Sequence, residues 1–171
     1  MNADELRALQ APIKARYQAD PAAARHTFQA SGTLRADRPS VHIANRFASF
    51  DAGLHPAAGG DGSEACSGDM LLEALVACAG VTFNVVATAM AVPWRSVRVV
   101  VEGEGDFRGT LGIAKDAPVG ITDIRLRFEV DAPAASDEQL ATLLRLTERY
   151  CVIAQTLRTP PSLSTALQRV S

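Results

Sequence analysis

The chain of 171 residues is 47% hydrophobic and 21% charged, a composition typical of one globular domain with a sizeable core. Its formal net charge of -2 and its scattered Lys and Arg residues exclude a basic surface for nucleic acid or anionic lipid. The N-terminal segment carries charges throughout and has no apolar signal-peptide core, so we expect a cytoplasmic protein. In that reducing compartment the three cysteines are expected to be free, catalytic or redox-cycling rather than permanently bridged.

The first elements expected along the chain are a peripheral helix and a hairpin. Residues 4–18 favour a helix that Pro12 starts, kinks or breaks, and we assign residues 1–25 to a helical extension and 26–171 to the main domain. Alternating polar and apolar residues predict a half-buried strand over 27–34, which residues 41–50 continue less cleanly after a turn. The following segment, rich in Gly, Pro and Ala, is expected to be a loop.

Residues 70–91 predict a long apolar helix that carries only one charge, Glu73. The helix has the length of a membrane span, about 20 residues, but Glu73, Asn84 and the ordinary composition around it argue against insertion. A helix that is apolar over most of its circumference belongs in the middle of a core. One domain of this size barely covers it, so we expect a second subunit to help. From composition alone, Cys78 in this helix is either a small buried hydrophobe or a reactive thiol.

The second half of the chain predicts an antiparallel sheet and another helix. Residues 94–107 and 121–130 alternate between apolar and polar side chains, so one face of the sheet meets water. Ser136 and Gln139 fit a capping box at the start of a helix. The apolar stripe of that helix is expected to be Leu140, Leu143, Leu144, Tyr150 and Cys151, and a last strand is expected within 162–170. Together these elements predict an α+β domain.

We expect neither a cofactor nor a metal. The glycine-rich stretch 103–109 misses the dinucleotide-binding spacing by one position, follows a strand without opening a helix, and is better explained as a turn or bulge. His42 and His55 have no cysteine or second histidine at metal-ligand spacing.

Three segments resemble the OsmC-like family, which includes osmotically induced protein C and the organic hydroperoxide resistance proteins: "GDMLLEALVACAGVTFNVVA", "VVVEGEGDFRGTLGI" and "ERYCVIAQTLRTPPSLS". The family motif P-x-E-L-L-L-x-A-L-x-x-C is matched by "CSGDMLLEALVAC", with Asp69 at the acidic position and Cys78 at the cysteine. The second family cysteine falls on Cys151. The resemblance covers residues 26–170.

The resemblance implies an intertwined homodimer in which antiparallel sheets wrap around central apolar helices. It also implies a thiol-dependent peroxidase: the Cys78 thiolate attacks an organic hydroperoxide, Cys151 condenses the resulting sulfenic acid to a disulfide, and an external dithiol reduces that disulfide. The alternative is a non-catalytic dimer that binds a small apolar ligand between its subunits. The cysteine pair discriminates between the peroxidase and the ligand-binding dimer, since a non-catalytic binding protein has no use for two redox-linked cysteines.

In the peroxidases that this chain resembles, an arginine held by an acidic residue lowers the pKa of the attacking thiol. The candidates here are Arg35, Arg38 in the predicted turn, and Arg46 on a predicted strand. The best-known peroxidases carry glutamate where this chain has Gly68, and Asp69 matches a different branch of the family.

The position of Asp69 leaves alternatives open. If Asp69 and Cys78 share one straight helix, about 13.5 Å separates them, so both cannot touch one substrate. Either Asp69 precedes the helix, or the site is completed across the dimer, or Asp69 is only a helix cap or first-turn acid. Cys66, in the loop before the helix, is expected to be incidental unless it replaces Cys151.

Overall fold

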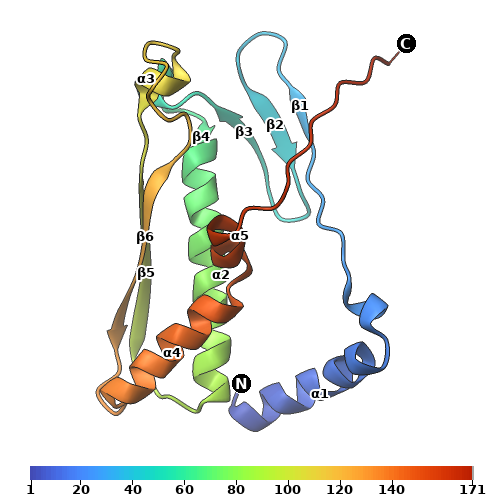
Figure 1. The fold of residues 1–171 in the computed structure, drawn as a ribbon, viewed down its shortest axis with the longest axis vertical. Helices are drawn as coiled ribbons and strands as arrows, with labels where there is room; N and C mark the ends of the chain where they lie inside the picture. Colours follow the sequence, from blue (N-terminus) through green and yellow to red (C-terminus); the bar gives the residue numbers. More distant parts are fainter. Residues whose placement is uncertain (171) are drawn as a thin grey trace.

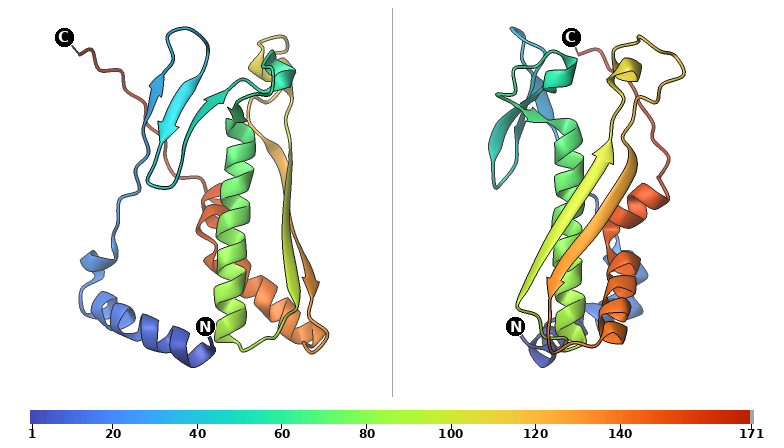
Figure 2. Two further views of the ribbon diagram at one scale, coloured as in Figure 1. Left: turned by 180° about the vertical axis from the view of Figure 1, so that it is seen from behind. Right: turned by 90° about the vertical axis from the view of Figure 1, so that its left-hand side faces the viewer.

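The computed structural model describes residues 1–170 as a long central helix flanked by two small sheets and shorter helices (Figure 1). The helices are α1 (Ala3–Ala19), α2 (Ser67–Ala89), α3 (Phe107–Thr110), α4 (Asp137–Tyr150) and α5 (Val152–Arg158), with single turns η1 (Pro21–Ala24) and η2 (Pro56–Ala58). The strands are β1 (Gly32–Leu34), β2 (Val41–Ala44), β3 (Ser49–Gly53), β4 (Ala65–Cys66), β5 (Ser96–Glu104) and β6 (Thr122–Asp131). Figure 2 shows that the β5–β6 ribbon runs along α2, while the β1–β4 sheet lies beside the first turns of α2 and α1 lies near its last turns.

The β5–β6 ribbon confirms the antiparallel pair expected from the alternating sequence. Val97 pairs with Val130 and Val99 with Phe128, so the apolar side chains of both strands share one face. The smaller sheet has the order β1-β2-β3-β4: β1, β2 and β3 are antiparallel neighbours, and the short β4, which the sequence analysis left in a loop, is parallel to β3.

The N-terminal hairpin differs from the prediction in extent. Within 27–34 only Gly32–Leu34 forms a strand, while 41–50, expected to be one strand, contains the turn between β2 and β3. The Asn45 side chain explains the turn, because its Oδ1 accepts hydrogen bonds from the backbone N–H groups of Phe47 at 2.8 Å and Ala48 at 3.0 Å.

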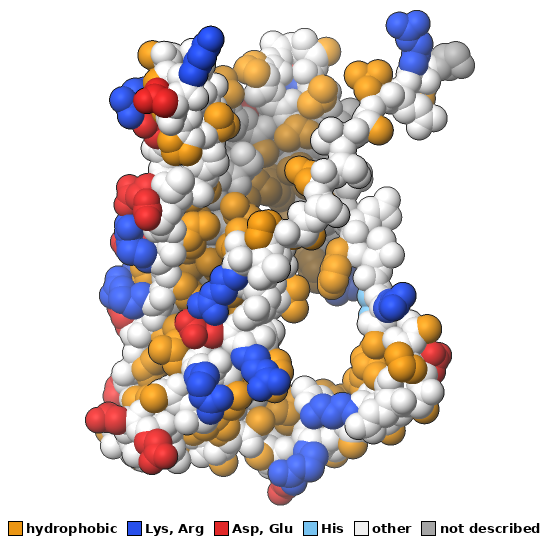
Figure 3. Space-filling view, in the orientation of Figure 1, with side chains coloured by type: hydrophobic (Ala, Val, Ile, Leu, Met, Phe, Trp, Pro, Cys, Tyr) orange, Lys and Arg blue, Asp and Glu red, His pale blue; other side chains and the backbone are white. Residues whose placement is uncertain are grey.

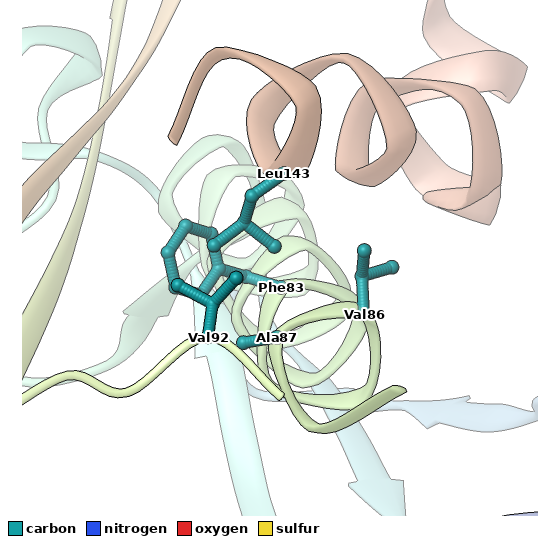
Figure 4. Packing of buried hydrophobic residues seen from close by; sticks show 5 residues of the cluster. All are labelled: Phe83, Val86, Ala87, Val92 and Leu143. Atoms are coloured by element: carbon teal, nitrogen blue, oxygen red, sulfur yellow. The ribbon is translucent and has the colours of Figure 1, made fainter. Parts of the chain in front are cut away.

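Helix α2 starts at Ser67, before the predicted Met70, and its second half forms a core with α4. Phe83, Val86 and Ala87 of α2 pack with Val92 and Leu143 (Figure 4), and the Phe83 ring stacks on Phe128 with 5.0 Å between ring centroids. Only 28% of the most apolar stretch of α2 is buried within the chain. Its length and composition would allow a membrane crossing, but the core helices of globular proteins satisfy the same criteria.

The capping box of α4 is confirmed. Ser136 Oγ accepts from the Gln139 backbone N–H at 3.2 Å, and Gln139 Oε1 accepts from the Ser136 backbone N–H at 2.9 Å. The predicted apolar stripe was right for Leu140 and Leu143 but wrong for Leu144 and Tyr150, which are 44% and 56% exposed. The prediction placed Cys151 on the same continuous helix, whereas α4 ends at Tyr150, before that residue.

The start of α1 lies beside the end of α2, whereas the C-terminal segment extends away from the core (Figure 1). Helix α1 forms despite the internal Pro12 and buries Leu6. The division of the chain at residue 25 stays a prediction. The strand expected within 162–170 was wrong: the segment has no regular structure, and Leu163 and Leu167 are 92% and 95% exposed. Alternating residues form a strand only beside a partner strand, and none of the described residues supplies one here.

The space-filling view shows an opening between α1, the extended segment that follows it and the helices around α2 (Figure 3). The chain exposes 12885 Å². A compact monomer of 18.1 kDa exposes about 8,100 Å². The chain therefore exposes far more surface than a protein of its mass that folds alone.

Candidate functional site

The fold brings Cys78 and Cys151 together. Cys78 lies in the middle of α2 and packs against a buried cluster formed by Leu75, Ala79, Cys151 and Ala154. Cys151 lies between α4 and α5, in an extended conformation with φ -71° and ψ 108°. The two thiols differ in access, since Cys151 is 0% exposed and Cys78 is half-buried.

The pKa of the Cys78 thiol lies below its ordinary value, as the net result of opposing effects. Burial is the largest single effect and raises the pKa. Hydrogen bonding by the backbone N–H of Ile153, by the Cys151 thiol and by the backbone N–H of Val152 lowers it. These lowering effects together exceed the effect of burial.

Two of the groups that lower the pKa of Cys78 come from the start of another helix. Val152 and Ile153 are the first residues of α5, and the first N–H groups of a helix have no partner within it. Although Cys78 is far from the start of its own helix, it packs beside the start of α5, whose first backbone N–H groups lower the pKa of its thiol.

The pKa of the Cys151 thiol is raised instead, and burial is the leading cause. A protonated Cys151 beside a Cys78 with a lowered pKa can donate a hydrogen bond to the thiolate. Thr82 lies one helical turn beyond Cys78, and its Oγ1 donates to the Cys78 carbonyl oxygen at 2.7 Å.

Cys66 and Asp69, two candidate site residues from the sequence, lie at the N-terminal end of α2. Cys66 directly precedes the helix, and about 18 Å of helix separates it from Cys78, so it cannot bridge Cys78 in the same chain. Asp69 lies in the first turn of α2, which excludes the alternative that it precedes the helix. It lines a cavity together with His55, Cys66 and Glu73, away from the Cys78 sulfur.

The candidate arginines lie in the turns of the β1–β4 sheet, so the expectation that Arg46 is on a strand was wrong. Arg35 donates to Asp51 at 2.8 Å, and Arg38 donates to both Glu64 and Asp51 at 2.8 Å. Arg46 lies in the β2–β3 turn, with its guanidinium 4.4 Å from the centre of the Phe47 ring.

Within residues 1–170, the leading influences on the pKa of Cys78 include none of these arginines. Arg35 and Arg38 line a pocket together with Ser67, the first residue of α2. About 16.5 Å of helix separates Ser67 from Cys78.

A cavity of about 380 Å³ shares Leu75 and Ala154 with the cluster that contains the cysteine pair, but neither cysteine lines it. Leu75, Ile121, Ile124, Leu126, Ala154 and Leu157 contribute aliphatic side chains to its walls. Asp123, Glu148 and Arg158 also line it, and Arg158 donates to Glu148 at 3.0 Å. Among residues 1–170, no group of three or more His, Cys, Asp or Glu side chains is placed to hold a metal ion.

These observations define an α+β protein built around one long apolar helix, with two cysteines from different elements meeting at the middle of that helix. The chain belongs to the OsmC-like protein family, whose sequence profile matches residues 60–166. No curated protein matches the sequence.

Solved structures of OsmC-like proteins share the fold. An OsmC-like protein from Mycoplasma pneumoniae has a TM-score of 0.65 and 18% identity, covering 79% of this chain and 89% of that chain. An organic hydroperoxide resistance protein OsmC from Legionella pneumophila has a TM-score of 0.58 and 12% identity, with 79% and 93% covered. The organic hydroperoxide resistance protein OhrB of Bacillus subtilis has a TM-score of 0.52 and 20% identity, with 78% and 93% covered. The OsmC-like fold inferred from the sequence motifs is confirmed.

The sequence reasoning missed the groups that act most directly on Cys78. The backbone donors of Val152 and Ile153 leave no trace in side-chain composition. Thr82 did leave a signal of another kind, because a hydroxyl one helical turn after Cys78 can donate to the Cys78 carbonyl oxygen, as it does here.

Proposed function

We propose that the protein is a thiol-dependent peroxidase that reduces organic hydroperoxides through Cys78 and Cys151. The observation that carries the proposal is the pairing of a half-buried Cys78, whose pKa is lowered, with a fully buried Cys151 in one cluster. Family membership and the names of the hydroperoxide resistance proteins with the same fold support a role with peroxides.

The cysteine pair supports a balanced reaction sequence. The Cys78 thiolate attacks the terminal peroxide oxygen, the O–O bond breaks, and a proton from solvent converts the leaving alkoxide to an alcohol. The Cys78 sulfenic acid then condenses with the Cys151 thiol, which forms a disulfide and releases water. An external dithiol takes up the oxidising equivalents and returns both thiols.

We propose further that the active species is a homodimer in the cytoplasm. The chain exposes about 4,800 Å² more than a compact protein of its mass. Part of this surface is an apolar stripe on α2 near Cys78, formed by Leu71, Val81 and Val85, which are 39%, 67% and 37% exposed. A second copy would cover it and could bring its own arginine cluster to the stripe. Sedimentation should show dimers at low micromolar concentration, and a folded monomer there would contradict the proposal.

Consumption of cumene hydroperoxide with a dithiol as reductant tests the activity. The wild type should turn over repeatedly, whereas Cys78→Ser should consume nothing, because a hydroxyl supplies essentially no nucleophile at neutral pH. Cys66→Ser is the matched control and should keep full activity. A wild type that consumes no hydroperoxide would refute the peroxidase.

One observation favours the alternative of a ligand-binding dimer: the cavity of about 380 Å³, partly lined by aliphatic side chains, that adjoins the cysteine cluster at Leu75 and Ala154. In that case the wild type would bind small apolar compounds without consuming peroxide. Equilibrium binding of a fluorescent apolar dye, measured with the thiols reduced and then oxidised, separates the two functions. A peroxidase forms the Cys78–Cys151 disulfide after one equivalent of peroxide, and a simple binding protein leaves both thiols free.

A further inference from the structure

Three side chains on one face of the β2–β3 hairpin form a hydrogen-bonded chain. The Ser49 hydroxyl oxygen is 3.0 Å from His42 Nε2, and His42 Nδ1 is 2.7 Å from Asp51 Oδ1. Both distances are those of good hydrogen bonds. A hydroxyl, an imidazole and a carboxylate are therefore joined in the order that serves a serine nucleophile, its general base and the group that orients the base.

The register of the hairpin produces this order. His42 pairs directly with Asp51 across the antiparallel strands, and Ser49 lies two residues before Asp51 on β3, so all three share one face of the sheet. Phe50, between Ser49 and Asp51, belongs to the opposite face. The turn held by the Asn45 side chain fixes this register, because a slip by one residue would move Ser49 and Asp51 away from His42.

The Asp51 carboxylate determines which nitrogen of His42 carries the proton. Hydrogen bonds, first from Arg35 and then from His42, lower the pKa of Asp51 to about 2, so Asp51 is ionised at neutral pH. An ionised carboxylate can only accept, and His42 Nδ1 must therefore carry a proton and donate it to Asp51. In the neutral ring Nε2 then has a lone pair, which accepts from the Ser49 hydroxyl.

Two arginines hold the Asp51 carboxylate in place. Arg35 Nη2 donates to both carboxylate oxygens of Asp51, at 2.8 and 3.0 Å, and Arg38 Nη2 donates to Oδ2 at 2.8 Å. Arg35 Nη2 is also 3.1 Å from His42 Nδ1, but a protonated Nδ1 cannot accept from it. Asp51 is therefore fixed from several sides and can in turn fix the imidazole ring of His42.

Access to solvent differs along the three side chains in the order that a nucleophilic site requires. Ser49 is exposed, the side chain of His42 is 36% exposed, and that of Asp51 is 19% exposed. A reagent from solution can thus reach the hydroxyl, while the orienting carboxylate is the most protected of the three. The hairpin lies on the opposite side of α2 from the β5–β6 ribbon, which packs against the cysteine pair (Figure 1).

We propose that Ser49 is a nucleophile, with His42 as its general base and Asp51 as the positioning residue, that accepts acyl groups from small activated esters. Ser49 Oγ attacks the carbonyl carbon while His42 Nε2 takes the hydroxyl proton, and the same nitrogen returns this proton to the departing alcohol as the C–O bond breaks. Water then attacks the acyl-serine with His42 as base, which releases the carboxylic acid and restores Ser49.

This activity needs no oxidant or reductant and does not rest on the peroxidase proposed above. Because the hydroxyl is open to water, a substrate there gains less electrostatic stabilisation than in an enclosed site. The site therefore suits esters whose leaving group is already good, such as aryl esters.

Labelling with a fluorophosphonate probe, which bonds to activated serines and releases fluoride, tests the nucleophile. Peptide mass mapping should find the probe on Ser49. His42→Gln keeps a polar side chain beside Ser49 but removes the base, and it should slow labelling at least about 100-fold, since general-base catalysis contributes about 10²–10⁴. Ser40→Ala is the matched control, because the Ser40 hydroxyl donates to Glu64 rather than to a histidine, and it should label Ser49 like the wild type.

Acyl transfer itself is measured with p-nitrophenyl acetate. The Cys78→Ser protein serves here, because a thiolate also attacks aryl esters. It should release about one equivalent of p-nitrophenol in a burst and carry the acetyl group on Ser49, whereas Cys78→Ser/Ser49→Ala should show neither. Probe and acetyl group both absent from Ser49, or His42→Gln labelling at the rate of the wild type, would overturn the proposal.

A measurement on the wild type separates the proposal from a loss of folding in the variants. The ¹⁵N chemical shifts of the His42 ring should show the proton on Nδ1 and none on Nε2 near pH 8, and Asp51→Asn should weaken this preference. A His42 ring that carries its proton on Nε2 in the wild type could not accept from Ser49, and that result would also refute the assignment.

Discussion

Replacing Val152 with proline should raise the pKa of Cys78 without disturbing the helix that begins there. Val152 is the first residue of α5, and its N–H is one of the donors that lower the pKa of the Cys78 thiol. Proline has no N–H, and it is well accepted at the first position of a helix, where no helical hydrogen bond is lost. The preceding residue, Cys151, already has the extended φ and ψ that proline requires of its neighbour. The side chain of Val152 is 59% exposed, so little packing is removed.

The expected magnitude follows from one lost hydrogen bond to a thiolate. Hydrogen bonds to charged groups contribute about 1.5–3 kcal/mol, and the lower end applies because Cys78 is partly exposed to solvent. Since a tenfold change in an equilibrium corresponds to about 1.4 kcal/mol, the thiolate fraction of Cys78 at neutral pH should fall by about tenfold. The first reaction with peroxide should slow by a similar factor.

Alkylation of Cys78 with iodoacetamide across pH, read by peptide mass mapping of the reduced protein, measures this effect. Val152→Ala keeps the N–H and should alkylate like the wild type, while circular dichroism checks that α5 is intact in Val152→Pro. If Val152→Pro and Val152→Ala react at the same rate, the backbone donors of α5 do not activate Cys78, and the account of the site given above is wrong.

Three further predictions follow from burial and charge. Cys151→Ser should consume about one equivalent of peroxide and then stall, with Cys78 driven to sulfinic and sulfonic acid as seen by mass spectrometry; no consumption at all would reverse the roles. Leu143→Ala should lower the free energy of unfolding by about 2–5 kcal/mol in urea titrations, because Leu143 is 0% exposed, and a loss below about 1 kcal/mol would contradict its place in the core. The Arg35 guanidinium, and after it His42, lower the pKa of Asp51 to about 2 from an ordinary 3.8, so Asp51 stabilises the fold above about pH 4 and loses that effect as pH falls toward 2. Asp51→Asn should flatten this part of the stability profile, and an unchanged profile would refute the assignment.

Elements with a strong local signal could be predicted from the sequence. The alternation in 121–130 and the capping box at Ser136 each involve residues that contact one another within one strand or one helix turn, so a short window holds all the information. The apolar helix at 70–91 was equally clear, and only its ends were misplaced: Ser67 and Gly68 read as loop residues, and the helix already ends at Ala89.

Features that depend on distant contacts could not be predicted in the same way. The turn of the β2–β3 hairpin depends on hydrogen bonds to one asparagine side chain, and an alternating strand pattern gives no sign of them. The ion pairs of Arg38 with Glu64 and Asp51 join residues far apart in the chain, so the sequence could name the arginine but not its partners. The cysteine pair was chosen by family resemblance, and only the fold explains why the two thiols differ.

The break between α4 and α5 is the structural feature that makes Cys78 more than a buried cysteine. In one continuous helix the N–H groups of Val152 and Ile153 would bond to the carbonyl oxygens of residues 148 and 149. The extended conformation of Cys151 prevents this, so both donors are free to face the Cys78 sulfur. One of the carbonyl groups left without its helical partner, that of Glu148, instead accepts from the Gln155 side chain at 2.7 Å. Interrupting an otherwise amphipathic helix therefore serves two ends: it buries the Cys151 thiol beside Cys78, and it turns backbone groups that would have closed a helix toward the thiolate.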